Sequence, residues 1–246
     1  MRNLDRPRSP QGQCAGREYV VSQEGIILRD PTPCGILSAI DDLIRKGLLE
    51  NVLQPTDAPA SRWSELLLVE VTDLPAPAHA YLDALSREYA NGTVMFHCYR
   101  VVERERFDNC LHEHPPEVFT AAFTAELFRN PAFRTLAPVN AGALSCGADI
   151  PWMTSSPFHL TATLADMLYR GGAYSPTRDA AEVLRIAQQA RIALWGSEEN
   201  SPESIFYLFS DAPWSPWFYN VAWDNTLIVL NRTKGEISCL FASDTD

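Results

Sequence analysis

The sequence predicts an α+β protein: a mixed sheet with an N-terminal strand–helix–strand portion, a helical middle and a C-terminal antiparallel hairpin. Two observations carry this prediction. The stretch from Ile205 onward is densest in aromatic and β-branched residues, and two of its apolar runs flank the polar, glycine-containing turn 231–235, which is typical of a β-hairpin. Upstream, apolar residues recur three and four positions apart, the spacing of amphipathic helices.

Length and charge limit the class of protein. A chain of 246 residues is long enough to bury a sizeable core without disulfides or a structural metal. The formal net charge of −11 repels nucleic-acid backbones and anionic membranes and favours basic partners. We therefore expect a basic protein as partner, with no nucleic acid and no membrane.

The cysteines and the N-terminus predict a compartment. No two cysteines form a CxxC pair, so we interpret all of them as reduced and expect no cofactor. The N-terminal residues are polar and basic rather than apolar, unlike a signal peptide, and no apolar run approaches the roughly 18 residues of a membrane span. These features favour a cytoplasmic protein. The six cysteines are Cys14, Cys34, Cys98, Cys110, Cys146 and Cys239.

The N-terminal third predicts a tail followed by strands and helices. Residues 1–16 have breakers and no periodicity, so we expect a disordered tail, with 17–246 forming a single domain whose weakest point for a subdivision lies near 104–116. Short strands are expected at 18–22 and 25–29. A helix follows from Pro33, with Thr32 as its N-cap.

A second strand–helix–strand pattern follows between residues 66 and 102. Strands are expected at 66–71 and 93–102, and the helix between them begins after Pro75 and ends in a left-handed cap at Asn91–Gly92. This order predicts a parallel strand pair joined by a right-handed crossover.

The middle of the chain is predicted to be helical. A helix over 118–128 stops at Asn130–Pro131. Ser156 caps a helix that ends at Gly171–Gly172, and Thr177 caps another that runs to Trp195. The closing strands are expected at 205–209, 226–230 and 236–241.

The densest group of possible metal ligands is Cys110, His112 and His114. A thiolate and two imidazoles suit zinc. No second ligand pair stands at a finger-like spacing, and two prolines follow directly. We therefore predict a polar surface loop here and no bound metal.

One catalytic alternative remains open. Cys146 lies in an irregular stretch, and His159 with Asp149 or Asp166 could serve it as base and orienting acid. That set would make the chain a small Cys/His-dependent hydrolase or transferase. Almost any chain of this length offers such a set, so we assign no catalytic residue.

The aromatic and acidic C-terminal stretch is the preferred binding site. Tryptophan and tyrosine dominate interface hot spots, and here they lie in or beside a loop bounded by prolines. Core packing of the aromatics and a frayed acidic terminus are the competing interpretations. We predict a bacterial inhibitor or immunity protein that neutralises a basic toxin or nuclease, and the oligomeric state stays open. The predicted binding residues are Trp214, Trp217, Tyr219, Trp223, Asp224, Asp244 and Asp246.

Overall fold

The computed structural model divides the chain into two compact units, Met1–Ala60 and Ser61–Asp246. It describes residues 11–14, 17–22 and 25–28 of the first unit, and residues 62–118, 120–141, 150–173, 179–197 and 204–245 of the second. The helix expected from Pro33 lies outside these residues. The division falls at residue 60, and the possible subdivision near 104–116 stays a prediction.

The first unit contains a three-stranded antiparallel sheet in the order β1-β2-β3. Its strands are β1 (Gln11–Cys14), β2 (Arg17–Ser22) and β3 (Gly25–Leu28). The pair β2–β3 matches the two strands predicted here, in antiparallel register. Strand β1 falls within the predicted tail of residues 1–16.

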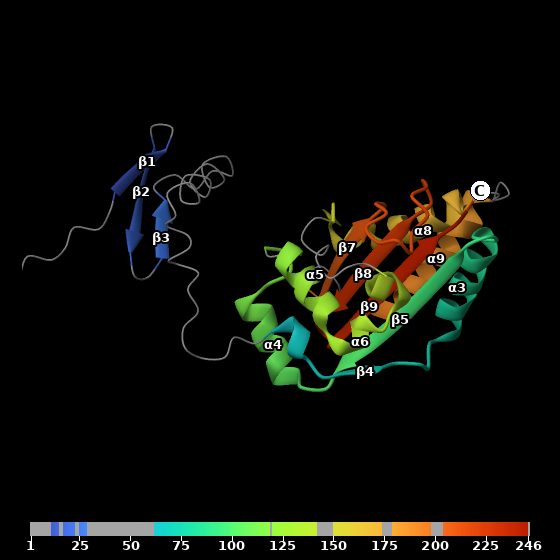
Figure 1. Cartoon of the computed structure of the whole chain (residues 1–246), viewed down its shortest axis with the longest axis horizontal. Helices are drawn as coiled ribbons and strands as arrows, with labels where there is room; N and C mark the ends of the chain where they lie inside the picture. The colour runs from blue at the N-terminus through green and yellow to red at the C-terminus, as the bar shows by residue number, and fades with distance from the viewer. Residues whose placement is uncertain are drawn as a thin grey trace, which may run out of the picture. The chain divides into compact units, whose positions relative to one another are not determined.

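The second unit combines a six-stranded sheet with helices (Figure 1). This arrangement confirms the predicted α+β class. Its helical elements are η1 (Trp63–Glu65), α3 (Ala76–Glu88), α4 (Arg104–Glu113), α5 (Thr120–Arg129), α6 (Pro131–Arg134), α7 (Ala137–Ala141), η2 (Pro157–His159), α8 (Leu160–Arg170) and α9 (Ala180–Trp195). Its strands are β4 (Leu68–Glu70), β5 (Thr93–Val101), β6 (Met153–Thr154), β7 (Ile205–Ser210), β8 (Asn225–Asn231) and β9 (Glu236–Ser243).

The sheet runs in the order β4-β5-β9-β8-β7-β6. Strands β8 and β9 form the predicted hairpin, from Asn231 opposite Glu236 to Asn225 opposite Ala242. Every residue of both strands is buried, because helices cover both faces of the sheet. Burial on two faces explains why these strands read as apolar runs without alternation.

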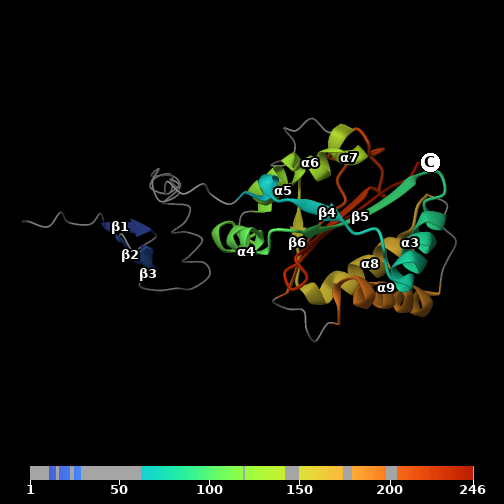
Figure 2. The same ribbon diagram turned by 90° about the horizontal axis from the view of Figure 1, so that it is seen from below.

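Helices form a layer on each side of the sheet (Figure 2). Helices α5, α6 and α7 lie on one side, and α3, α8 and α9 on the other. Alternate residues of β9 divide between the two cores: Phe241 packs with the first layer and Leu240 with the second. The hairpin therefore supplies the centre of both cores.

The strand pair around α3 differs from the prediction. Strand β4 pairs with β5 in antiparallel fashion, with Glu70 opposite Tyr99, so the sheet is antiparallel throughout. Strand β5 begins at Thr93, six residues or about 20 Å beyond that pair. Helix α3 spans a similar length, about 20 Å. It therefore carries the chain from the end of β4 to the far end of the sheet, and β5 runs back from there alongside β4. In a parallel pair, the helix would instead run back along the sheet, so that both strands started at the same end.

Three local predictions also change. Residues 110–114, expected as a polar surface loop, belong to the last turn and C-cap of α4 (Arg104–Glu113). Asp179 caps α9, since its side chain accepts from Ala181 N at 2.9 Å; Thr177 lies outside the described residues. Gly92 is not a left-handed cap: a Cβ there would lie 1.9 Å from the Ser243 carbonyl oxygen, so close packing against β9 requires glycine.

Asn130 joins the start of the second unit to its helices. Its side chain is buried, and its Oδ1 accepts from Ala132 N at 3.0 Å, which caps α6. Its Nδ2 donates to the carbonyls of Trp63 (3.2 Å) and Leu66 (2.9 Å). One amide thus begins a helix and holds the segment that leads into β4.

We expect Asn130→Ala to lower the free energy of unfolding by roughly 2–4 kcal/mol, because it removes a cap and leaves two buried carbonyls without donors. Asn130→Asp keeps the capping oxygen but cannot donate, so it separates the two contributions. Urea denaturation of both variants measures them. A loss by Asn130→Asp close to zero would contradict the tethering role.

Candidate functional site

The loop between β7 and β8, residues 211–224, contains most of the predicted binding residues. Trp214 is half-buried, stacks on Phe128 at 5.1 Å between ring centroids, and donates from Nε1 to Thr226 Oγ1 at 2.8 Å. Phe218 is buried between Trp214 and Trp217. Trp214 therefore anchors the loop to the first core.

The other aromatics of this loop lie nearer the surface. Trp217 is half-buried, with its ring at 71° to that of Phe241. Trp223 is half-buried against the second core. Tyr219 is 57% exposed. The structure thus brings three aromatics to the outside of the loop, although each of the two tryptophans is also part of the packing.

Asp224 closes the loop from inside. Its carboxylate is fully buried, and Oδ2 accepts from Val221 N at 3.0 Å. Oδ1 accepts from the hydroxyl of Ser243, which in turn accepts from Tyr219 N at 3.3 Å. The loop is therefore fastened to the end of β9, and Asn220 adopts a left-handed conformation (φ 63°) within it.

Asp244 is also fully buried and joins three segments. Oδ1 accepts from the backbone N–H groups of Asn91 (3.1 Å) and Thr245 (2.9 Å), and Oδ2 from that of Ala173 (3.0 Å). A Cβ on Gly172 would lie 1.9 Å from Oδ2, so this carboxylate needs a glycine beside it. It links the α3–β5 turn, the end of α8 and the end of β9.

Burial of Asp224 and Asp244 changes their expected role. In this structure a basic partner cannot reach either carboxylate, since both accept internal hydrogen bonds. Asp246 lies outside the described residues. Among the described residues, the surface part of the predicted binding site is Tyr219 with the half-buried Trp217 and Trp223, and Asp211 at the start of the loop is exposed as well.

The three residues weighed as possible metal ligands do not converge. Cys110 is buried on α4, where burial raises the pKa of its thiol to about 12. His112 is exposed on the same helix, and His114 lies at its C-cap. Among the residues that the structure describes, no group of three or more His, Cys, Asp or Glu side chains could hold a metal ion.

The residues of the catalytic alternative are separated or not described. Cys146 and Asp149 lie outside the described residues. His159 is exposed on η2, with Nδ1 at 2.6 Å from Ser155 Oγ. Asp166 is exposed on α8 and pairs with Arg170 at 3.0 Å.

The other described cysteines are poor nucleophiles. Cys98 and Cys239 are buried and carry no disulfide. Burial raises the pKa of both thiols, so little thiolate forms at neutral pH.

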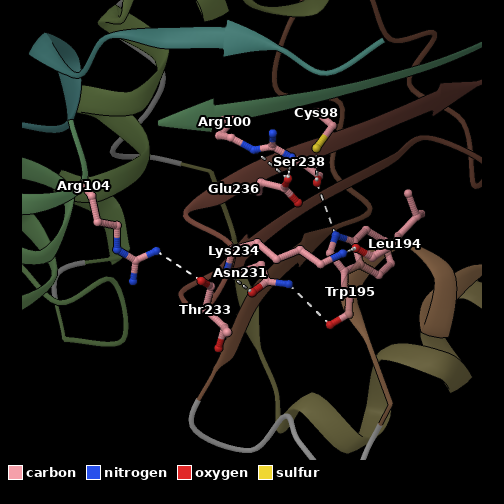
Figure 3. Close-up of polar contacts among 10 residues, drawn as sticks. All are labelled: Cys98, Arg100, Arg104, Leu194, Trp195, Asn231, Thr233, Lys234, Glu236 and Ser238. Atoms are coloured by element: carbon pink, nitrogen blue, oxygen red, sulfur yellow. Dashed lines mark hydrogen bonds and ion pairs between the residues drawn. The ribbon is translucent and has the colours of Figure 1, made fainter. Parts of the chain in front are cut away.

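The polar groups around the hairpin turn are engaged with one another (Figure 3). Lys234 Nζ donates to the Leu194 carbonyl at 2.7 Å, and Asn231 Nδ2 donates to the Trp195 carbonyl at 3.3 Å. Both contacts satisfy carbonyls in the last turn of α9, where a cation is favourable. Arg104 donates to the Thr233 carbonyl at 3.3 Å.

The same network continues into the sheet. Arg100 Nη2 lies 2.6 Å from Oε1 of the buried Glu236. Trp195 Nε1 donates to Ser238 Oγ at 3.2 Å, and that hydroxyl points to Cys98 Sγ. These groups hold α9 and β5 against the hairpin, so we interpret them as a structural joint.

Sequence reasoning missed a polar contact and a groove on β4 and β5. His97 Nδ1 lies 2.8 Å from Glu70 Oε1. The only signal for this pair was an acid and a histidine on strands that prove to be neighbours. An open groove of about 530 Å³ runs alongside and includes Val69, Glu70 and Arg100. Glu70 contacts His97 and Arg100 pairs with Glu236, while the third charged residue of the groove is Asp73. Since four valines also line it, we interpret the groove as a chain-docking surface more than as a reaction centre.

Removal of the Asp244 carboxylate should destabilise the fold more than loss of an exposed acid. We expect Asp244→Ala to lower the free energy of unfolding by roughly 3–5 kcal/mol, because three N–H groups lose a charged acceptor. Asp244→Asn keeps one oxygen and should lose less. Urea denaturation measures both variants, with the exposed Asp83→Ala on α3 as the control for charge. Equal losses for Asp244→Ala and Asp83→Ala would contradict this assignment.

Comparisons with known proteins identify a family but no activity. No curated protein and no solved structure matches the chain. None of the described helices is long and apolar enough to cross a membrane. Residues 118–246, more than half of the chain, match the model described as a family of unknown function (DUF6183). This stretch includes the aromatic loop, Asp224 and Asp244, and the chain belongs to the DUF6183 family.

Proposed function

We propose that this chain is an acidic, non-enzymatic binding protein of the inhibitor or immunity type, which neutralises a basic protein such as a toxin or nuclease in the bacterial cytoplasm. The observation that carries the proposal is the way loop 211–224 is held. Trp214 and the buried Asp224 fix it near both ends, and Tyr219 stands outward between them, 57% exposed.

A loop held in this way favours tight binding. Most of the entropy cost of ordering a binding loop falls away when internal bonds already fix its backbone. Tyrosine and tryptophan then add large contact areas with few rotatable bonds. The exposed Tyr219 and the half-buried Trp217 and Trp223 fit this description.

The net charge supports a basic partner. A formal charge of −11 attracts a cationic surface over distances of about 10 Å at moderate salt. The exposed Asp211 lies at the start of the aromatic loop. Since Asp224 and Asp244 are internal, we attribute the attraction to the surface as a whole and to Asp211, the exposed acid of this loop.

The binding test compares Tyr219→Ala with Tyr169→Ala, a similarly exposed tyrosine on α8. Immobilised wild-type protein is used to capture basic proteins from the native bacterium, and each captured protein is then purified and measured by surface plasmon resonance. If Tyr219 is a hot spot, its loss should raise Kd about 30-fold, mainly through faster dissociation. Tyr169→Ala should leave Kd unchanged.

The captured partner should also lose its own activity when bound. A partner that is not basic, or one that binds both tyrosine variants equally, would overturn the proposal. Thermal melting of each variant shows whether the loop stays folded. This check matters less for Tyr219, which is exposed, than for a variant of the half-buried Trp217.

The acidic surface leads to a separate prediction for the binding of this protein to its captured partner. Asp211→Asn should slow association severalfold and leave dissociation nearly unchanged, because a peripheral charge acts mainly on encounter. The association rate of wild type should fall as salt rises. Rate constants measured over a series of salt concentrations check both effects, and an association rate that is independent of salt would contradict the electrostatic part.

A further inference from the structure

Strand β4 is an edge of the six-stranded sheet (Figure 1). Val71 N–H donates to the Cys98 carbonyl at 2.7 Å, and Val102 N–H donates to the Leu67 carbonyl at 3.0 Å. Bonds to one neighbour recur at every second residue of an antiparallel strand. The odd-numbered residues of this segment therefore bond inward to β5, and the even-numbered residues direct their N–H and C=O groups outward.

The outward groups belong to Leu68 and Glu70, and no described residue bonds to them. Natural edges are usually protected by proline, lysine, a bulge or an inward charge. Here the one charge is Glu70, whose carboxylate turns to His97 on the face of the sheet. Within the part of the chain that the structure describes, the edge is therefore open to another strand.

An apolar patch lies on the opposite face of the same edge. Leu67, Val69 and Val102 are 56%, 55% and 52% exposed. Val69 of β4 shares its face with alternate residues of β5, and Leu67, directly before β4, bonds to Val102. Val71 continues this row and is half-buried. We call these four residues the β4 patch; the groove described above runs through it.

We propose that β4 pairs with β4 of a second copy of this chain, in an antiparallel twofold arrangement centred on Val69. Leu68 then lies opposite Glu70 of the second copy, and these residues exchange the outward hydrogen bonds. Val69 of one copy lies opposite Val69 of the other at the twofold axis, and Leu67 of each copy lies opposite Val71 of the other. A twofold contact requires such self-complementarity, and every pair in the odd-numbered row is apolar on both sides.

A second copy fits this edge better than a charged peptide does. The odd-numbered row offers no charge from residue 67 to 71, so a basic segment would lie against valine and leucine. A short strand contact lies at the small end of dimer interfaces, so we expect a dimer that dissociates on dilution. Two copies of charge −11 repel each other, so added salt should strengthen the dimer.

The first test is the mass of the full chain in solution. Sedimentation equilibrium from roughly 1 to 300 µM should show a transition from one chain of 27.5 kDa to twice that mass. Val69→Lys places two cations at the axis and should raise the dissociation constant at least about tenfold. Leu184→Lys, on a similarly exposed position of α9, is the matched control and should dimerise as wild type does.

The second test isolates the outward backbone bonds. Glu70→Pro removes an N–H that bonds to no described residue, together with the Glu70 side chain and its His97 contact. Glu70→Ala removes the same side chain and its His97 contact while keeping the N–H. We expect Glu70→Pro to weaken the dimer about tenfold or more relative to Glu70→Ala. Equal dissociation constants would show that β4 does not pair.

The third test fixes the register. Residues opposite each other at a non-hydrogen-bonded position have Cα atoms about 4.5 Å apart, within reach of a disulfide. Val69→Cys should therefore oxidise to a covalent dimer. Val71→Cys should not form this disulfide, because residue 71 of one copy lies about 14 Å along the strand from residue 71 of the other. Wild type under the same oxidation controls for the native cysteines.

These results can fail independently of the proposed function. A chain that keeps the mass of one copy throughout, or a Val69→Cys protein that forms no more covalent dimer than Val71→Cys, overturns the β4 pairing. Salt separates the two associations, because it should strengthen the pairing of two acidic copies and weaken the capture of a basic partner. Tyr219→Ala should leave the dimer unchanged.

Discussion

The second unit depends on a carboxylate at the end of its most buried strand. Asp244 follows β9 and accepts hydrogen bonds from the backbone of residues 91, 173 and 245. A buried carboxylate is favourable only where fixed donors replace its water, and here three N–H groups do so. The contact also demands two glycines, Gly92 and Gly172, since a side chain at either would collide with this corner.

The corner and the aromatic loop are continuous. Ser243 donates to Asp224 and accepts from the backbone of Tyr219, so consecutive residues at the end of β9 fasten first the loop and then the α3 and α8 ends. A change at Asp244 is therefore expected to reach the loop through the backbone of β9. The family match begins at residue 118 and includes both carboxylates and the loop, whereas the donor Asn91 comes from the preceding segment.

The two surfaces proposed here lie at opposite ends of β5. Thr93 pairs with Ser243, beside the aromatic loop, and Tyr99 pairs with Glu70 on the outer strand. A strand of nine residues spans about 30 Å. Pairing through β4 would therefore leave the loops of both copies free, and a dimer would present two identical binding sites. Two linked sites hold a multivalent partner more tightly than one site does.

The sequence by itself determined the elements whose signals are local. The hairpin follows from apolar runs around turn 231–235, the end of α8 from Gly171, and the helical period from residues such as Leu160 and Leu164, which are buried. Only the tertiary structure decided the direction of β4 relative to β5, because periodicity records which side of a strand is buried and not which strand lies beside it. Tertiary contacts likewise decided that the carboxylates of Asp224 and Asp244 are buried and hydrogen-bonded. Acids near a chain end look like a solvated terminus until distant N–H groups, at residues 91 and 173, are brought to them.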